Sequence, residues 1–307
     1  MSGPEAAESP ASAPLAELLR QTALAVAAAL PGFLPAPCPR AGELGPAMRH
    51  LLAGGKRVRA LVVRLAAETC GLPAAAVTPT ACAFELVHTA TLIHDDLPCI
   101  DDADLRRGLP AVHRAFGQST ALLAGDALLV AAFGALARQA EVSATPPERV
   151  VPVIAEFAEA VGAAGVIGGE AADIAGERCP VDAERLVTIH SCKTARLFIA
   201  AARAGGLLAG AEPTLVDRLG RYADRLGLLF QVTDDLLDAT GEAGQMGKPA
   251  GLDAAAGKQT YPALLGVEGA RRHAALLAEE TLALAASLPV PHEAWFGLVG
   301  LVRGRQA

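Results

Sequence analysis

The feature that most constrains the fold of this 307-residue chain is its long series of apolar stretches with helical spacing. Alanine and leucine dominate these stretches, aromatic residues make up 4% of the sequence, and alternating β-branched runs are rare. Such stretches favour α-helix, because alanine and straight-chain side chains lose little freedom in a helix. Glycine and proline separate them, so we predict helices at about 13–30, 41–53, 56–70, 77–97, 117–139, 147–172, 182–207, 212–239 and 258–286.

The chain ends and the cysteines suggest a simple organisation. Residues 1–12 are rich in proline, serine and acidic residues, and they lack the basic start and apolar run of a secretory signal. We expect a disordered tail over 1–12 and a single all-α domain over 13–307. The six cysteines are scattered without a CxxC pair, which is typical of reduced thiols in a cytoplasmic protein.

Hydropathy and charge argue against a membrane-spanning protein and against a nucleic-acid binder. Mean hydropathy is +0.36, but a spanning helix needs about 20 apolar residues in a row. Prolines between Pro31 and Pro39, Asp126 and Arg203 interrupt the candidate runs, so we expect no membrane span. The net charge of −7 argues against a nucleic-acid binder, which usually presents a basic face.

A first acidic motif, LIHDDLPCIDDADLRRG, occupies residues 92–108 at the end of an apolar helix. His88 and Asp95 are seven residues apart and share a helical face. Pro98 cannot continue the helix, because it lacks an N–H and restricts the residue before it. We therefore expect Asp101 to return to Asp95 through a loop.

A second acidic motif, FQVTDDLLD, occupies residues 230–238. Helical spacing places Gln231, Asp234 and Asp238 on one stripe, with Asp235 beside it. The flanking residues are leucines and a valine, so the stripe is expected to face a cavity rather than bulk water.

Carboxylates at this density repel one another unless a cation joins them. Oxygen-only donors indicate a hard cation, and Mg²⁺ binds one or two carboxylates together with substrate phosphates. A solvated acidic helix end is the alternative for a single motif. Two motifs, each on an apolar helix, favour the metal.

Basic residues accompany both motifs. They are Lys56, Arg57 and Arg59 in GGKRVR, Arg106 and Arg107, Lys193 in HSCKTA, Lys248 in MGKPAG, and Lys258 in GKQTYP. Arginine offers paired donors to phosphate and lysine offers a point charge. The set suggests two polyphosphate substrates, one held through metal and one held directly by cations. The sequence contains no GxxxxGK[ST], GxSxG or HExxH motif.

In this order, GGKRVR, LIHDDLPCIDDADLRRG, LAGDALL, HSCKTA, FQVTDDLLD and GKQTYPALLG closely resemble the short-chain trans-polyprenyl diphosphate synthases. These enzymes make farnesyl and geranylgeranyl diphosphate. The resemblance implies a helical bundle of the isoprenoid synthase type around a deep apolar cavity, and a homodimer. It implies isopentenyl diphosphate and allylic diphosphates (dimethylallyl, geranyl, farnesyl) as substrates, with three Mg²⁺ ions per active site.

The resemblance also implies residue roles. Mg²⁺ is held by Asp95, Asp96, Asp101, Asp234, Asp235 and Asp238. The allylic diphosphate is contacted by Arg106, Lys193 and Lys248, with Lys258 nearby. Isopentenyl diphosphate is bound by Lys56, Arg59, His88 and Arg107. The reacting end is lined by Thr194, Phe230 and Gln231. Ionisation of the allylic C–O bond then gives a carbocation that the isopentenyl double bond attacks, and water must be excluded.

Product length should depend on the helical turn before Asp95, at Ala90 and Thr91. In this family a bulky aromatic residue there stops growth at farnesyl. Ala90 is small, so we predict the twenty-carbon product, geranylgeranyl diphosphate, with the fifteen-carbon product as the alternative. One departure from the family is Glu170 in Gly168-Gly169-Glu170, where relatives usually have GGQ.

Two other functions fit parts of the pattern. A class I terpene cyclase uses an acidic Mg²⁺ motif but has no need of GGKRVR for a second diphosphate. A non-catalytic synthase subunit would have lost an acidic motif or the catalytic lysines, and this chain keeps all of them.

Overall fold

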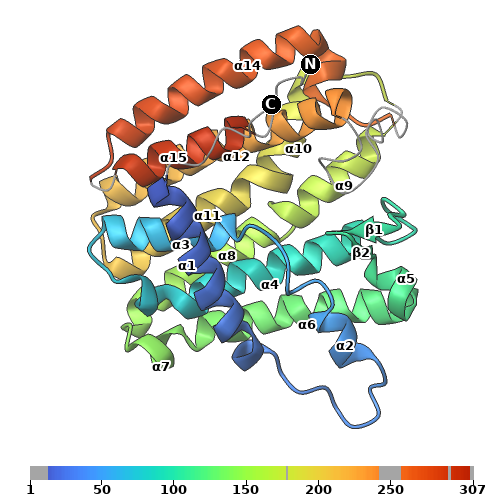
Figure 1. The fold of residues 1–307 in the computed structure, drawn as a ribbon, viewed down its shortest axis with the longest axis vertical. Helices are drawn as coiled ribbons and strands as arrows, with labels where there is room; N and C mark the ends of the chain where they lie inside the picture. The colour runs from blue at the N-terminus through green and yellow to red at the C-terminus, as the bar shows by residue number, and fades with distance from the viewer. Residues whose placement is uncertain (1–12, 178, 242–256, 290–291, 305–307) are drawn as a thin grey trace, which may run out of the picture. The chain divides into compact units, whose positions relative to one another are not determined.

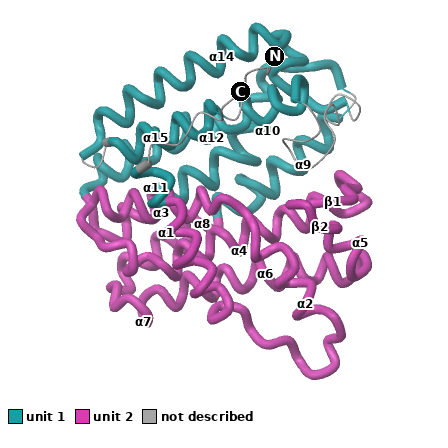
Figure 2. Tube along the Cα trace, viewed as in Figure 1, with its two compact units in different colours: residues 1–18, 159–202, 212–307 teal, residues 19–158, 203–211 magenta. Residues whose placement is uncertain are grey.

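The computed structural model describes residues 13–177, 179–241, 257–289 and 292–304. Within these ranges the regular structure is helical except for one two-stranded hairpin (Figure 1). The predicted all-α class is therefore confirmed. The chain separates into two compact units, which are described in turn (Figure 2). The extent predicted for one domain, 13–307, stays a prediction.

Unit 2 comprises residues 19–158 and 203–211. Its helices include most of α1 (Ala13–Ala29), α2 (Leu44–Arg49), α3 (Val58–Thr69), α4 (Thr78–Asp95), α5 (Val112–Phe116), α6 (Gln118–Ala137), α7 (Gln139–Ser143) and most of α8 (Pro147–Val161). Short 3₁₀ turns lie at Leu30–Phe33 and Ala74–Val77. The helix α4 is the buried centre of this unit and packs against α3 and α6. Phe84 on α4 meets Phe157 on α8 edge to face, with ring centroids 5.1 Å apart.

A close approach between α4 and α6 depends on one glycine. A Cβ atom at Gly125 on α6 would overlap the imidazole of His94 on α4. The same imidazole lies 3.1 Å from the carbonyl oxygen of Leu122, so its ring is held against α6 at the last turn of α4. The end of α4, which carries the first acidic motif, is thereby tied to its neighbour.

Unit 1 comprises residues 1–18, 159–202 and 212–307. Its helices are α9 (Val166–Gly176), α10 (Ala183–His190), α12 (Pro213–Thr240), α14 (Tyr261–Ala286), α15 (His292–Arg303) and the first half of α11 (Arg196–Ala209). A π-helical turn, η3 (Ser191–Ala195), joins α10 to α11. The long helix α12 packs against α14, α15 and η3. Tyr222 on α12 donates its hydroxyl to the carbonyl of buried Trp295 at 2.7 Å.

Several predicted boundaries are corrected by the structure. The helix expected at 147–172 ends at Val161, and α9 begins at Val166. The residue before α9, Gly165, has non-helical φ −127° and ψ −129°, and it lies so close to the carbonyl of Ala160 that a Cβ there would overlap it. The helix expected at 182–207 is interrupted by the π turn, and the one at 41–53 shrinks to Leu44–Arg49. The helix α15, after Pro291, was not predicted.

The antiparallel hairpin of β1 (Leu105–Arg106) and β2 (Leu109–Pro110) was also not predicted. Its two turn residues, Arg107 (φ 55°) and Gly108 (φ 75°), both have positive φ. Positive φ at both central positions is the requirement of a tight type I′ turn. The Arg-Gly pair was therefore a turn signal as well as a charge signal.

Among the residues that the structure describes, three segments meet the length and composition of a membrane-spanning helix, contrary to the expectation that every run is interrupted. They are Ala74–Asp95, Gln118–Ser143 and Pro147–Gly176. The most buried is Ala74–Asp95, where 72% of the apolar window lies inside the fold. The apolar character of α4 is thus largely used for packing within the protein.

Candidate active site

The first acidic motif begins where α4 ends. Asp95 is the last helical residue, and Pro98 follows two residues after Asp96. The amide N–H of Asp101 donates to the carbonyl oxygen of Asp95 at 2.9 Å, so the loop returns to the helix end. The sequence prediction of this return is confirmed. Asp95 and Asp101 are brought together, and both are half-buried.

Asp96 has a different environment from its neighbours. Its carboxylate is fully buried, and Oδ1 accepts hydrogen bonds from Arg106 Nε at 2.9 Å and Nη2 at 2.5 Å. Burial raises the pKa of Asp96 above its ordinary value, and the hydrogen bond from Arg106 acts against that rise. In turn, Asp96 raises the pKa of Arg106 despite the burial of the guanidinium. This pair fastens the β1–β2 hairpin to the end of α4.

The GGKRVR loop is organised around Arg57, a residue for which the sequence predicted no specific role. Arg57 is buried, has φ 53°, and donates from Nη1 to Glu85 Oε2 at 3.1 Å. Glu85 Oε1 accepts the amide N–H of Ala60 at 3.2 Å, in the first turn of α3. Arg57 also donates to the carbonyl of Leu52. The ion pair leaves Lys56 exposed and Arg59 half-buried on either side of it.

Arg107 lies across the glycine pair of this loop. Its Nη1 donates to the carbonyl of Leu51 at 2.6 Å. A Cβ at Gly54 or Gly55 would press on the Arg107 side chain, so the glycines make room for it. Burial and the nearby Arg57 lower the pKa of Arg107 below its ordinary value. Cations from the loop and from the hairpin turn are thereby gathered in one place.

His88 on α4 faces this same group of cations. Its pKa lies well below the ordinary value, first because of burial and then because of Arg59, Arg107, Arg106 and Arg57. The imidazole is therefore neutral near pH 7. We refer to Arg57, Arg59, Arg106, Arg107 and His88 as the arginine cluster. It contains three of the four residues predicted to bind isopentenyl diphosphate, and the fourth, Lys56, is exposed next to Arg57.

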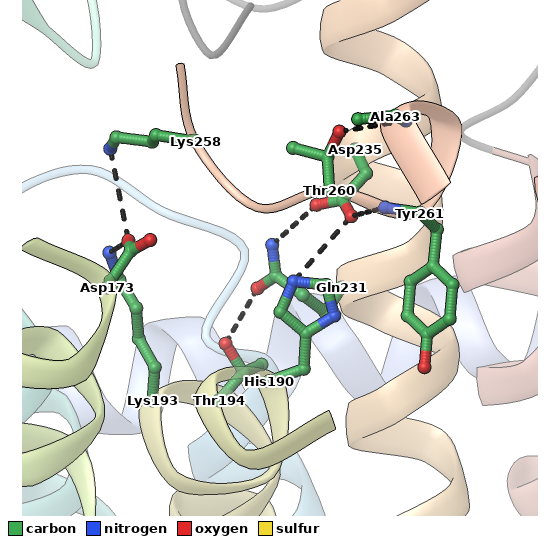
Figure 3. Close-up of polar contacts among 10 residues, drawn as sticks. All are labelled: Asp173, His190, Lys193, Thr194, Gln231, Asp235, Lys258, Thr260, Tyr261 and Ala263. Carbon is green, nitrogen blue, oxygen red and sulfur yellow. Dashed lines mark hydrogen bonds and ion pairs between the residues drawn. The ribbon is translucent and has the colours of Figure 1, made fainter. Parts of the chain in front are cut away.

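In unit 1 the second acidic motif carries a hydrogen-bonded chain (Figure 3). Thr194 donates its hydroxyl to Gln231 Oε1 at 2.7 Å, and Gln231 Nε2 donates to Asp235 Oδ1 at 3.0 Å. Asp235 Oδ2 accepts the amide N–H of Tyr261 at 2.9 Å. Both oxygens of this buried carboxylate thus have protein donors, and they join η3, α12 and the start of α14.

His190 stands beside this chain, with Nε2 3.6 Å from Asp235 Oδ2. The pKa of His190 is lowered to about 3, mainly by burial; Asp173 opposes this shift and Lys193 adds to it. The neutral ring packs against Tyr261, with ring centroids 5.2 Å apart. It acts here as a packing partner of the network.

Lys193 lies in the middle of the π turn. Its ammonium is 2.6 Å from Glu170 Oε2 and 2.7 Å from Asp173 Oδ2, both on α9. Lys258 Nζ approaches the same Asp173 oxygen at 4.0 Å (Figure 3). Single π turns inside helical segments often occur at functional sites. The turn points two adjacent residues, Lys193 and Thr194, at different partners.

Asp234 and Asp238 stand one helical turn apart on α12, the first half-buried and the second buried. Among the residues that the structure describes, no group of three His, Cys, Asp or Glu side chains is arranged as a metal cluster. The donor chemistry still fits Mg²⁺, which takes few carboxylates and completes its shell with water and substrate phosphates. Lys248 lies outside the described residues.

The remaining predicted residues are apolar or lie near the apolar core. Ala90 is buried on α4, and the Thr91 hydroxyl donates to the carbonyl of His88 at 2.9 Å. Phe230 on α12 packs against Phe198 with ring centroids 5.6 Å apart. The deep apolar cavity expected next to Ala90 stays a prediction.

Solved structures with the same fold include an FPP/GFPP synthase from Zymomonas mobilis, with a TM-score of 0.81 and 34% identity over 94% of this chain and 98% of that one. A geranyltransferase from Helicobacter pylori, complexed with magnesium and isoprenyl diphosphate, has a TM-score of 0.81 and 29% identity over 95% and 97% of the two chains. These likenesses confirm the isoprenoid synthase type of fold.

Curated relatives include geranylgeranyl pyrophosphate synthase 9, chloroplastic, from Arabidopsis thaliana, which is 46% identical over 233 residues. The match covers 75% of this chain and 64% of the relative. A geranylgeranyl pyrophosphate synthase, chloroplastic, from Catharanthus roseus is 43% identical over 235 residues, 76% of this chain and 65% of the relative. The chain thus spans slightly under two thirds of the length of these relatives.

The predicted cytoplasmic location is wrong by this comparison, because these relatives are named as chloroplastic proteins. The predicted family is confirmed. The sequence model of the polyprenyl synthetase family matches residues 42–286, which is most of the chain. Together with the order of the motifs and the shared fold, this match shows that the chain belongs to the polyprenyl synthetase family.

Proposed function

We propose that this protein is an Mg²⁺-dependent prenyltransferase that condenses isopentenyl diphosphate with allylic diphosphates and releases geranylgeranyl diphosphate. Family membership and the names of the plant relatives support the reaction class and the product. The observation that carries the proposal is the arginine cluster beside neutral His88. It offers a cationic site for a second diphosphate substrate without metal, which a terpene cyclase would not need.

Two buried aspartates have a positioning role in this proposal. Protein donors hold Asp96 and Asp235. On the family resemblance, we assign Asp95, Asp101, Asp234 and Asp238 to direct contact with Mg²⁺, with three ions. When bound, the metal would stabilise negative charge on the departing diphosphate. The basic residues Arg106, Lys193, Lys258 and Lys248 would contact the same group.

The chain's own residues account for the other requirements of the reaction. The arginine cluster would fix the isopentenyl diphosphate so that its double bond lies within reach of the allylic carbon. The allylic C–O bond breaks, and the isopentenyl double bond forms the new C–C bond to the allylic carbon. The resulting cation then loses a proton from the neighbouring carbon of the isopentenyl unit to the departing diphosphate, which leaves a new double bond. Thr194, Gln231 and Phe230 would line the reacting end. Buried alanines and leucines of α4 would exclude water from the carbocation.

The proposal is tested by a product-length assay. The purified protein is incubated with Mg²⁺, isopentenyl diphosphate and dimethylallyl, geranyl or farnesyl diphosphate, and the dephosphorylated alcohols are sized. A twenty-carbon alcohol is the expected result. A fifteen-carbon end product keeps the reaction and discards the proposed product. Consumption of geranylgeranyl diphosphate without isopentenyl diphosphate would identify a cyclase, and no elongation with any primer would favour a non-catalytic subunit.

Replacing Ala90 with tyrosine should shorten the product to fifteen carbons. Ala90 is buried one turn and a half before Asp95, so a large ring there would fill the space available to a growing chain. The measurement is the same sizing assay, with Thr91→Ser as a control that keeps side-chain size small. Continued release of the twenty-carbon product by a folded Ala90→Tyr variant would place the length limit on another residue.

We also propose a homodimer, formed through α6. The apolar side chains Leu122, Leu123 and Val130 on this helix are 47%, 56% and 70% exposed. Exposed apolar residues that recur on one helix are typical of an interface between subunits. Sedimentation equilibrium should give twice the chain mass, and a monomer mass at all concentrations would contradict the assignment.

A further inference from the structure

We propose that Glu170 competes with the diphosphate group for Lys193 and thereby weakens diphosphate binding and speeds its release. The inference rests on the proposed function for the identity of the ligand. It concerns a residue that has no role in the reaction described above. The argument comes from one cluster in unit 1, formed by Glu170, Asp173, Lys193 and Lys258.

The backbone brings the two sides of this cluster together. A Cβ at Gly169 on α9 would overlap the backbone of Lys193, so α9 lies directly against the π turn. Glu170 and Asp173 are three residues apart and share the face of α9 that meets this turn. Both carboxylates consequently reach the same ammonium, at 2.6 and 2.7 Å.

The ion pairs are largely shielded from solvent. The side chains of Lys193, Glu170 and Asp173 are 23%, 14% and 9% exposed. Charge interactions in such a setting are stronger than between exposed side chains, because water and salt screen them less. Any anion that binds Lys193 must therefore compete with its ion pairs to Glu170 and Asp173.

The charges in the cluster cancel. Two lysines face two carboxylates, with Asp173 shared between Lys193 and Lys258 (Figure 3). Asp173 therefore serves to place both lysines. Glu170 contacts only Lys193 among the ion pairs described for this cluster, so its removal would leave the lysines in position with one net positive charge.

An arriving diphosphate oxygen must take the place of the Glu170 carboxylate on the ammonium, or sit beside it. The first event costs an ion pair, and the second places like charges close together. Either way the carboxylate opposes the ligand. The exchange breaks no covalent bond, and it runs in reverse when the product or diphosphate departs.

The test is Glu170→Gln, which keeps the side-chain size and removes the charge. Isothermal titration with inorganic diphosphate and Mg²⁺ should show a Kd lowered by about tenfold, the size expected when one repulsive charge is removed at close range. The KM for the allylic substrate should fall while the KM for isopentenyl diphosphate stays constant. Glu279→Gln, an exposed glutamate on α14, removes the same charge elsewhere and should change nothing.

A double-mutant cycle separates this role from a general structural one. In a Lys193→Met background, Glu170→Gln should lose its effect on diphosphate binding, because the competition needs the ammonium. Unchanged or weaker binding in Glu170→Gln would overturn the inference, as would an equal gain in both backgrounds, or no diphosphate binding by either protein. Glu170→Ala serves as the second variant if the glutamine variant does not fold.

The outcomes also separate this inference from the proposed function. Diphosphate binding is measured without turnover, so a protein that fails the elongation assay can still show tighter binding in Glu170→Gln. That result would keep the role of Glu170 and reject the proposed reaction. Elongation by the wild type, with unchanged diphosphate binding in Glu170→Gln, would keep the proposed reaction and reject the role of Glu170.

Discussion

Replacing Asp95 or Asp234 with alanine is expected to lower kcat for chain elongation by about a thousandfold, the upper range for losing one group that stabilises charge in the transition state. Both carboxylates are half-buried and lie on regular helix, at the end of α4 and in α12. Neither is assigned a packing role in the core, so the unfolding temperature should change little. Product formation and thermal unfolding are measured on the same preparations.

The matched control for this experiment is Asp104→Ala. Asp104 lies in the same motif and is exposed, and its ion pair with Arg114 at 2.9 Å is at the surface. Exposed pairs contribute little, so both turnover and stability should stay close to the wild type. A wild-type kcat in Asp95→Ala would remove the assignment of this carboxylate to the metal. A raised Mg²⁺ requirement in Asp95→Ala would support it.

Much of the fold was predictable because helix formation here follows local composition. The helix α4 was expected at about 77–97 and runs over Thr78–Asp95, since the apolar run and Pro98 both mark its limits. The return of Asp101 to Asp95 was predicted from the same proline. At the break between α8 and α9, where Gly165 lies against the carbonyl of Ala160, the sequence carried no signal beyond the glycine itself.

The π turn and the hairpin show two other reasons for the missed elements. The π turn at Ser191–Ala195 adds a single residue to a helical turn, and an insertion this short is not recognised from helical periodicity. The hairpin was hidden because Arg106 and Arg107 were interpreted only as phosphate ligands. The following Gly108, which allows a tight turn, was not weighed.

The residue types of the candidate site were predictable from the sequence, but the hydrogen-bond partners of each side chain were not. Six aspartates were expected to act alike, yet Asp96 and Asp235 accept hydrogen bonds from Arg106, Gln231 and Tyr261. A sequence shows that a charge is present, while tertiary packing decides what satisfies it. Glu85 was the available signal for Arg57: an acid inside an apolar helix needs a buried partner.

That buried pair leads to the second large effect. Replacing Glu85 with alanine should lower the free energy of unfolding by about 3–5 kcal/mol, because it leaves the Arg57 charge buried and unpaired. The side chains of Arg57 and Glu85 are only 3% and 2% exposed, and Glu85 also accepts the Ala60 amide in the first turn of α3. Urea denaturation followed by circular dichroism measures the change.

The chain provides a matched surface pair for comparison. Glu268 and Arg271 lie one turn apart on α14, with Arg271 Nη1 3.1 Å from Glu268 Oε1, and the side chains of Arg271 and Glu268 are 54% and 73% exposed. Replacing Glu268 with alanine should cost at most about 0.5 kcal/mol, the size of a helical surface pair. Equal losses in the two variants would show that burial does not strengthen the Arg57–Glu85 pair.

A milder substitution of Glu85 tests how the pair serves the reaction. Arg57 orders the end of the loop, which carries Lys56, and the first turn of α3, which carries Arg59. A folded variant with a weakened pair should therefore bind isopentenyl diphosphate less tightly. Glu85→Gln keeps the shape and one acceptor, and it is the variant for kinetics. Its KM for isopentenyl diphosphate should rise while the KM for the allylic substrate stays near the wild-type value. Equal increases in both would mean that the pair supports the fold without organising the arginine cluster.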